Sequence, residues 1–327
     1  MHRRNSLLAL AALGAAAASP WARAQQKNRL PRVAILHSGA AANLIKRSEV
    51  FTRAMRELGY EDGRNVQVQW LSANGQSDLL AEMAAQLGRE SPEVIVSASA
   101  ITTRALQAVS QRIPIVMAAA EDPVAEGFVR SLTHTGNNVT GVSTSVLDQL
   151  RRQIELLSEV APRLRRVTAL LNPTNPIYKT YRARVEFNVP GGLRLAVVDA
   201  STPKEMERAF TRARDDTEGV LVMNDPDYYT LRREVTEQAL SSRRPTIYPL
   251  RGYVEAGGLL SWGPNTEANF ARTAWYVDRI LKGAKPAELP IETPSRFELV
   301  ANRATARLLG ITLPADILKQ ASVIGTA

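Results

Sequence analysis

The chain of 327 residues contains no cysteine and only three histidines. The lack of cysteine excludes disulfide bonds, a thiol nucleophile and a thiolate-ligated metal site. His2, His37 and His134 are too few to predict a histidine-based metal centre. The sequence also has no G-x-S-x-G elbow, no H-E-x-x-H pair and no Walker phosphate-binding loop. The usual signatures of hydrolases, metalloenzymes and nucleotide-binding proteins are therefore missing, and we expect no cofactor.

Aromatic residues are also scarce, at 6% of the chain, although the chain is basic. It has 41 Lys and Arg against 32 Asp and Glu, a net charge of +9 and a pI near 10.0. The basic residues are spread among acidic ones, which is typical of solvated surfaces. Because no nucleic-acid-binding motif accompanies the charge, we expect no nucleic-acid partner.

The first 24 residues have the pattern of an export signal. Arg3 and Arg4 precede an apolar run of about a dozen residues, and residues 22–24 (Ala-Arg-Ala) offer a small-x-small cleavage site. The run is shorter than the roughly 20 apolar residues that a membrane-spanning helix needs. We therefore predict that residues 1–24 are a cleaved signal peptide and that the mature protein is periplasmic, without stable membrane insertion. The paired arginines leave both the Sec and the Tat export routes open.

Beyond residue 30, short β-branched runs alternate with stretches of helical period. This alternation is typical of parallel sheets covered by helices on both faces, so we predict an α/β fold with two series of strands. The strands are predicted at residues 32–36, 66–70, 94–96 and 113–117 in the first series, and at 167–171, 193–198, 220–223 and 246–248 in the second.

Several helix boundaries can also be predicted. Gly59 and Gly88 each follow an amphipathic stretch and are expected to end it. Thr202 and Glu205 have the spacing of a capping box, with a proline between them in the first turn. A helix is therefore expected to begin beside Thr202.

The two series predict two lobes. We assign residues 30–143 with 250–285 to the N-terminal lobe, and residues 144–249 with 286–327 to the C-terminal lobe. This division assumes that the segment after residue 250 returns to complete the first sheet. Several chain crossings between lobes predict a hinged clamp, in which a cleft closes by rigid-body motion.

Ligands of open α/β sheets bind beyond the carboxyl ends of the strands, beside helix N-termini. In this chain the loops at those positions are rich in hydroxyl, amide and carboxyl groups, which orient small polar ligands. The candidate ligand-binding residues are His37, Ser38, Ser97, Ser99, Thr102, Glu121 and Asp122 in the first lobe, and Asn172, Asn175, Tyr178, Asn224, Asp225 and Tyr248 in the second.

Each candidate also has a structural interpretation. Asp122, which precedes Pro123, either shapes a turn or is the counter-ion of a ligand ammonium group, with Glu121 as the second candidate for that role. Ser38, Ser99 and Thr102 either cap helices or bind a ligand carboxylate. The asparagines are also common in turns, and the tyrosines are more often packing or lobe-interface residues than stacking platforms for a ligand.

A set of short segments carries a family resemblance. These segments are Asp122-Pro123-Val124, residues 136–141 (Gly-Asn-Asn-Val-Thr-Gly), 172–176 (Asn-Pro-Thr-Asn-Pro), 254–259 (Val-Glu-Ala-Gly-Gly-Leu), 263–265 (Gly-Pro-Asn), 280–286 (Ile-Leu-Lys-Gly-Ala-Lys-Pro) and 297–300 (Phe-Glu-Leu-Val). Together they resemble the ABC-transporter substrate-binding proteins whose better-known members bind tryptophan or related amino acids. Where such proteins often have Gly-Thr-Pro after the third strand, this chain has Ser99-Ala100-Ile101. The resemblance therefore leaves the first-lobe pocket open to a different solute.

The resemblance implies a type I periplasmic-binding-protein fold, a two-lobed clamp that presents a small-molecule solute to a membrane permease. It implies binding without catalysis, with an aromatic or other amino acid as ligand, and we expect a monomer. Two alternatives stay open. One is a periplasmic receptor for a membrane sensor, and the other is a periplasmic enzyme on the same scaffold.

Overall fold

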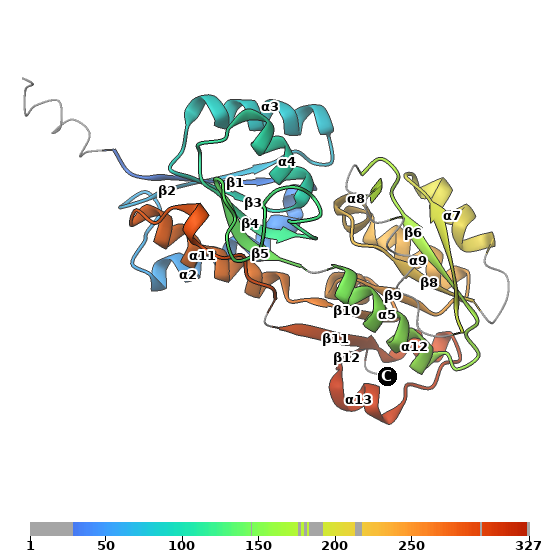
Figure 1. Cartoon of the computed structure of the whole chain (residues 1–327). Coiled ribbons are helices and arrows are strands. Elements are labelled where there is room, and N and C mark those ends of the chain that lie inside the picture. The colour runs from blue at the N-terminus through green and yellow to red at the C-terminus, as the bar shows by residue number, and fades with distance from the viewer. Residues whose placement is uncertain are drawn as a thin grey trace, which may run out of the picture.

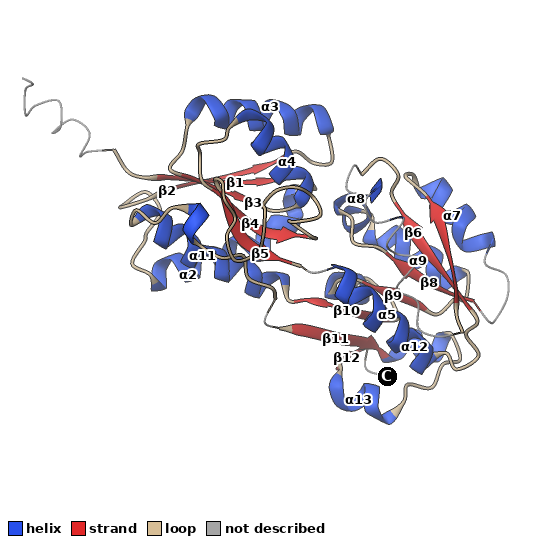
Figure 2. Ribbon diagram, in the orientation of Figure 1, coloured by secondary structure: helices blue, strands red, loops and turns tan. Residues whose placement is uncertain are grey.

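The structure is a computed structural model that describes residues 29–144, 146–175, 178–179, 182, 192–212, 218–294 and 296–325. The expected signal peptide, residues 1–24, lies outside the described residues. Two sheets, each flanked by helices, form two lobes joined along one side (Figures 1 and 2). Among the described helices, none has the length and apolar character needed to cross a membrane. The predicted α/β class and two-lobed clamp are confirmed.

The first lobe is built on a parallel five-stranded sheet with the order β2-β1-β3-β4-β5. In β1, Val33 and Ile35 pack on one face of the sheet, whereas Ala34 and Leu36 pack on the other. Both faces are buried, which explains the continuous apolar run of this strand. The strands are β1 (Arg32–His37), β2 (Gln67–Ser72), β3 (Val94–Ser97), β4 (Ile115–Ala120) and β5 (Val139–Ser143).

Helices cover both faces of this sheet (Figure 1). Phe51 and Phe270 belong to the core on one face, and Leu80 and Leu106 belong to the core on the other. The covering elements are η2 (Ala41–Leu44), α2 (Ile45–Glu57) and α11 (Thr266–Leu281) on the first face, and α3 (Ser77–Glu90) and α4 (Ala100–Val109) on the second.

The second lobe is built on a seven-stranded sheet with the order β12-β11-β10-β9-β8-β6-β7. Its strand pairs are parallel except for β10 with β11. The strands are β6 (Arg166–Leu171), β7 (Arg194–Asp199), β8 (Glu218–Val222), β9 (Thr246–Tyr248), β10 (Leu260–Pro264), β11 (Phe297–Asn302) and β12 (Ser322–Ile324). The helices are α5 (Val146–Val160), α7 (Pro203–Arg212), α8 (Pro226–Thr230), α9 (Arg232–Ser241), α10 (Arg251–Glu255), α12 (Arg303–Leu308) and α13 (Ala315–Gln320).

The path of the chain between lobes differs from the expected division. β10 pairs with β9 and β11, so residues 250–264 belong to the second lobe and not to the first. The segment after η3 (Pro286–Glu288) lies along the first sheet, where Glu292 forms a bridge with Val142. The run of buried residues at Leu259-Leu260 fits the core of either sheet, so its sequence does not say which one it joins. We propose that the lobes comprise residues 30–143 with 266–294, and 146–264 with 297–325.

The predicted start of a helix at Thr202 is confirmed, whereas the predicted end of a helix at Gly88 is wrong. Thr202 Oγ1 accepts a hydrogen bond from Glu205 N at 3.3 Å, and Glu205 Oε2 accepts one from Thr202 N at 3.2 Å, so the capping box is present. Gly88, however, lies within α3, and the helix continues to Glu90. Ser91 takes the left-handed conformation that ends the helix, with φ of 50°. A Cβ on Gly88 would make ordinary van der Waals contact with the Val109 side chain at 3.4 Å, so the packing of α3 on α4 does not require glycine here.

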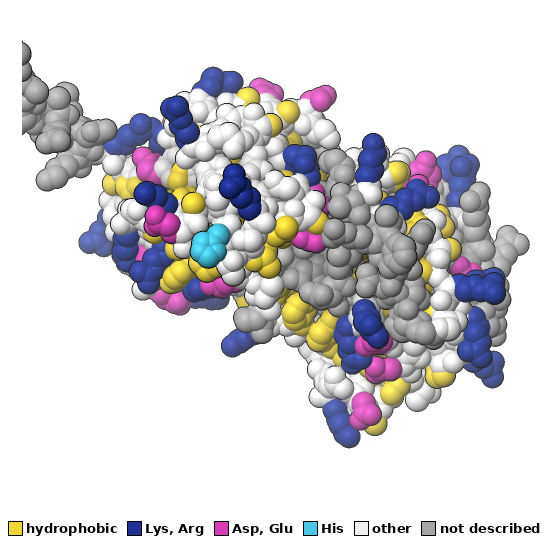
Figure 3. Space-filling model, in the orientation of Figure 1, with side chains coloured by type: hydrophobic (Ala, Val, Ile, Leu, Met, Phe, Trp, Pro, Cys, Tyr) yellow, Lys and Arg dark blue, Asp and Glu magenta, His cyan; other side chains and the backbone are white. Residues whose placement is uncertain are grey.

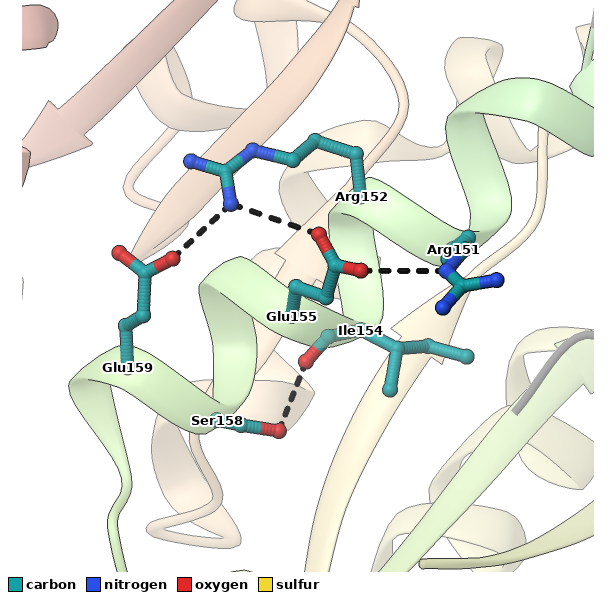
Figure 4. A network of polar contacts seen from close by, with 6 residues as sticks. All are labelled: Arg151, Arg152, Ile154, Glu155, Ser158 and Glu159. Atoms are coloured by element: carbon teal, nitrogen blue, oxygen red, sulfur yellow. Dashed lines mark hydrogen bonds and ion pairs between the residues drawn. The ribbon is translucent and has the colours of Figure 1, made fainter. Parts of the chain in front are cut away.

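Charged side chains are mixed over the surface. In the view of Figure 3, Lys and Arg are scattered over both lobes, with Asp and Glu between them. On α5, for example, Arg152 contacts Glu155 at 3.5 Å and Glu159 at 2.9 Å (Figure 4). The dispersed charge expected from the sequence is present on this face.

Candidate functional site

A cavity lies between the two lobes, at the carboxyl ends of strands from both sheets. Its volume is about 590 Å³, including the solvent-filled space at its mouth. The lining residues are His37, Asn43, Arg47, Ala98, Ser99, Ala119 and Glu121 from the first lobe, Asn224, Asp225, Pro226, Tyr229, Pro249 and Leu250 from the second, and Thr144, Gln149, Pro264 and Thr266 from the region of the chain crossings. The cavity therefore lies at the strand ends where ligand binding was expected from the sequence.

His37 ends β1 and is the histidine of the cavity. Its side chain is buried, and neither ring nitrogen has a hydrogen-bond partner among the described residues. Burial, with a smaller contribution from the charge of Arg47, lowers the pKa of His37 to about 3. The ring is therefore neutral at physiological pH, and its nitrogens can donate or accept a hydrogen bond from a guest molecule.

Glu121 follows β4 and is the most perturbed carboxyl group in the cavity. Its Oε1 accepts a hydrogen bond from Asn224 Nδ2 of the second lobe at 3.2 Å. Its Oε2 is buried and has no partner in the described part of the chain. Burial first, and then the carboxylates of Glu126 and Asp225, raise the pKa of Glu121 to about 8. The group is therefore protonated at neutral pH, and a cation beside it would favour its ionised form.

The hydroxyl groups at the first-lobe strand ends mostly bind one another. Ser99 Oγ lies 3.1 Å from Ser38 Oγ and 2.9 Å from Thr102 Oγ1, and it accepts a hydrogen bond from Thr102 N as the N-cap of α4. Ser97 Oγ lies 2.6 Å from Thr103 Oγ1. Of the predicted hydroxyl residues, Ser99 lines the cavity, whereas Ser38, Ser97 and Thr102 are not among the residues that line it.

Asp225 organises the second-lobe wall. It caps α8 by accepting hydrogen bonds from Asp227 N at 2.9 Å and from Tyr228 N at 3.1 Å. It also accepts from Asn172 Nδ2 at 3.2 Å and from Asn175 Nδ2 at 2.8 Å. The two predicted asparagines thus lie outside the cavity lining and hold Asp225 in place. Because four donors already occupy its carboxylate, Asp225 has little capacity left for a ligand.

The remaining predicted residues have structural positions. Asp122 accepts a hydrogen bond from Ala125 N at 3.0 Å and so shapes the turn after β4. Tyr248 is fully buried and stacks on Tyr253 with ring centroids 5.0 Å apart. Tyr178 is also buried. Asp122, Tyr178 and Tyr248 lie outside the lining of the cavity.

Several lining residues were not predicted from the sequence. Asn43, Arg47 and Tyr229 come from helices, whereas the strand-end rule examined only the residues that directly follow strands. A wider search through η2 and the first turn of α2 would have included Asn43 and Arg47. Tyr229 lies in α8, the short helix that Asp225 caps, and would have needed the same wider search.

The lobes contact each other across the cavity mouth. Besides the bond between Glu121 and Asn224, Asn43 Nδ2 donates to Thr230 Oγ1 at 3.4 Å, and Arg232 Nη1 donates to Asn43 Oδ1 at 3.3 Å. These pairs join residues far apart in sequence, one in each lobe. In this structure the two lobes of the clamp are therefore in direct contact.

The described residues include no group of three or more His, Asp or Glu side chains arranged to hold a metal ion. What the cavity offers instead is a set of hydrogen-bonding groups, one cation and apolar walls. This arrangement suits the enclosure of a small molecule that has both polar and apolar parts.

Comparisons with known proteins agree with this geometry. A family model described as ABC transporter substrate binding protein matches residues 32–324. The chain is 23% identical over 279 residues to a tyrosine-binding protein of Clostridioides difficile strain R20291. The matched region covers 85% of this chain and 80% of that protein.

Solved structures show the same fold. A domain from Streptococcus pneumonia in complex with L-Trp is 26% identical, with a TM-score of 0.83, over 90% of this chain and 100% of that one. A ligand-free, open substrate binding protein from Clostridium difficile is 22% identical, with a TM-score of 0.68, over 91% of this chain and 100% of that one. The matched proteins are solute-binding proteins and not enzymes. The chain belongs to the ABC transporter substrate binding protein family.

Proposed function

We propose that this protein is the exported solute-binding component of an ABC import system and that it binds an amino acid, with aromatic amino acids as the first candidates. The observation that carries the proposal is the cavity between the lobes, which is lined by apolar side chains and by Glu121. One oxygen of this carboxyl group has no hydrogen-bond partner among the described residues. The similarity to proteins named for tyrosine and L-Trp supports the same class of ligand.

Glu121 is the proposed partner of the ligand ammonium group. Its Oε2 is buried without a partner among the described residues, whereas the carboxylate of Asp225 is occupied by four donors. An ammonium group beside Glu121 would satisfy this oxygen and ionise the carboxyl group. Asp122, the candidate preferred from the sequence, shapes a turn outside the cavity.

The apolar walls are the proposed site of the ligand side chain. Ala98 and Ala119 come from the first lobe, and Pro226, Tyr229 and Pro249 come from the second. Because apolar groups from both lobes line the cavity, a ligand that fills the cavity buries apolar surface of both lobes at the same time. A tight complex would therefore favour the closed clamp.

Closure is proposed to follow a population shift. A ligand that touches both lobes binds the closed state more tightly than the open one, and its differential affinity sets the shift. The closed form would then be recognised by a membrane permease, while residues 1–24 direct export to the periplasm before cleavage. Amino-terminal sequencing of the exported protein should find Gln25 as the first residue.

Isothermal titration calorimetry with each of the twenty amino acids tests the proposal. We expect saturable binding of at least one aromatic amino acid, and a loss of about 10-fold to 100-fold in affinity for Glu121→Gln. The matched control is Asp122→Asn, which removes a neighbouring carboxylate outside the cavity and should leave affinity nearly unchanged. If none of the twenty binds, the proposed ligand class is wrong. If Asp122→Asn has the larger effect, the assigned ammonium site is wrong.

A further inference from the structure

Arg47 is a cation of the cavity, and no ion pair joins it to an Asp or Glu among the described residues. It lies in the first turn of α2 and lines the cavity, and this turn contains no acidic residue. Across the described part of the chain, its nearest recorded contacts are with aromatic rings. The guanidinium Cζ lies 5.3 Å from the ring centroid of Phe270 and 5.9 Å from that of Tyr229. Ring contacts of this kind position a guanidinium but leave its five N–H donors available.

The surroundings of Arg47 disfavour an unpaired charge. Burial lowers the pKa of Arg47, and the nearby Tyr229 and Glu267 only partly offset that effect. Glu267 is exposed, and no ion pair between it and Arg47 is present in the described structure. A partly buried cation with free donors is costly, and an anion placed in the cavity would offset that cost.

The groups that the sequence predicted for a ligand carboxylate are already engaged. The hydroxyls of Ser38 and Thr102 bind Ser99, and neither residue is among those that line the cavity. Ser99 lines the cavity, but its oxygen also caps α4. Of the charged side chains that line the cavity, Arg47 alone is basic. The strongest unoccupied donor available to an anion is therefore its guanidinium.

We infer that Arg47 binds the carboxylate of the ligand and thereby selects carboxylic acids over amines. This inference rests on the proposed function and assigns the second charged group of the same ligand. Tyr229, which comes from the second lobe, covers Arg47 in the closed clamp. A carboxylate bound at Arg47 would then lie beneath Tyr229, which reaches this position only when the lobes close.

The test compares compounds that keep or lack each charged group. L-tryptophan, L-tyrosine, tryptamine, tyramine, indole-3-propionate and 3-(4-hydroxyphenyl)propionate are titrated into the wild-type protein, Arg47→Gln and Arg53→Gln. Arg53 is the matched control, because it is an exposed arginine of the same helix and lies outside the cavity lining. Circular dichroism and the melting temperature verify that each variant folds.

We expect Arg47→Gln to weaken binding of the four acids by about 10-fold to 100-fold and to change binding of the two amines by less than about threefold. Arg53→Gln should change neither group. Equal losses for acids and amines, or an equal loss in Arg53→Gln, would overturn the role of Arg47 and leave the proposed function intact. Binding of none of the six compounds to the wild-type protein would overturn the proposed ligand and this inference together.

Discussion

At the scale of single residues, the environment of Glu121 sets the charge of the carboxyl group that we propose as the partner of a ligand ammonium group. The group is buried behind Asn224, with the carboxyl groups of Glu126 and Asp225 nearby, and its pKa is raised to about 8. A protonated carboxyl group costs less to bury than an ionised one. The ligand-free cavity is thus stable with Glu121 neutral, and a cationic ligand must displace its proton.

Ligand binding should therefore release a proton below pH 8. With its pKa raised to about 8, Glu121 is protonated at pH 7 in the free protein. In the proposed complex the ligand ammonium group would hold it ionised, so affinity should rise with pH. We expect a slope of about one decade per pH unit between pH 6 and pH 7.5, and a plateau above pH 8. Calorimetry in buffers of different ionisation enthalpy measures the proton count. Glu121→Gln should abolish the slope, and a wild-type affinity that does not vary with pH would contradict the assignment.

At this scale, the expectation that ligands bind at strand ends predicted part of the cavity lining. It found His37, Ser99, Glu121, Asn224 and Asp225, which line the cavity, because parallel strands bring their carboxyl ends to one edge. The strand-end expectation could not distinguish residues that line the cavity from neighbouring residues that do not. This distinction depends on the direction in which each side chain points. Tyr248 shows this, because it ends a strand beside the cavity yet packs on Tyr253 in the core.

At the scale of elements, the short β-branched runs predicted β1 to β4 and β6 to β9, whereas β5, β11 and β12 were not predicted. The pairing of strands that are far apart in the chain was not predictable. The capping box of Thr202 and Glu205 forms hydrogen bonds within four consecutive residues, so the local sequence is enough to predict it. The partner of β10 depends on a sheet edge formed by segments far away in the chain. Its apolar residues fit either core, and only the structure shows that it pairs with β9 and β11.

Gly141, in β5, marks a place where two strands approach too closely for a side chain. Its φ is +126°, and a Cβ there would overlap the backbone of Met117 in the neighbouring β4. We expect Gly141→Ala to lower the free energy of unfolding by about 2–4 kcal/mol through strain and displaced backbone. Urea denaturation measures this change. Gly59→Ala is the matched control, because its φ is also positive but its Cβ would meet no atom within 4 Å, so the loss should be smaller. Equal losses would contradict the close-approach argument.

The charged network on α5 should contribute little to stability. Arg152 contacts Glu155 and Glu159, and Arg151 contacts Glu155 at 3.2 Å, all on the helix surface (Figure 4). Exposed ion pairs are screened by solvent, and ordering long side chains offsets much of their attraction. We expect Arg152→Ala to lower the free energy of unfolding by less than about 1 kcal/mol, as measured by urea denaturation at low salt. A loss of several kcal/mol would show that the network has a larger role.

At the scale of the whole molecule, the chain passes between the lobes after β5, after β10 and before β11. The crossings predicted from the sequence are present, although their positions differ from the expected boundaries. Several connections along one side allow the lobes to rotate about that side while the opposite edges separate. Contacts such as Asn43 with Thr230 and Glu121 with Asn224 would break in such an opening.

The most direct test of the account is the distance between the lobes with and without ligand. The chain has no cysteine, so Asp78→Cys on α3 and Lys204→Cys on α7 introduce two exposed labelling sites, one in each lobe, for double electron–electron resonance. The account predicts a broad or longer distance distribution in the ligand-free protein that becomes single and shorter when a saturating aromatic amino acid is added. An unchanged distribution in the presence of a ligand that calorimetry shows to be bound would contradict closure of the two lobes over that ligand.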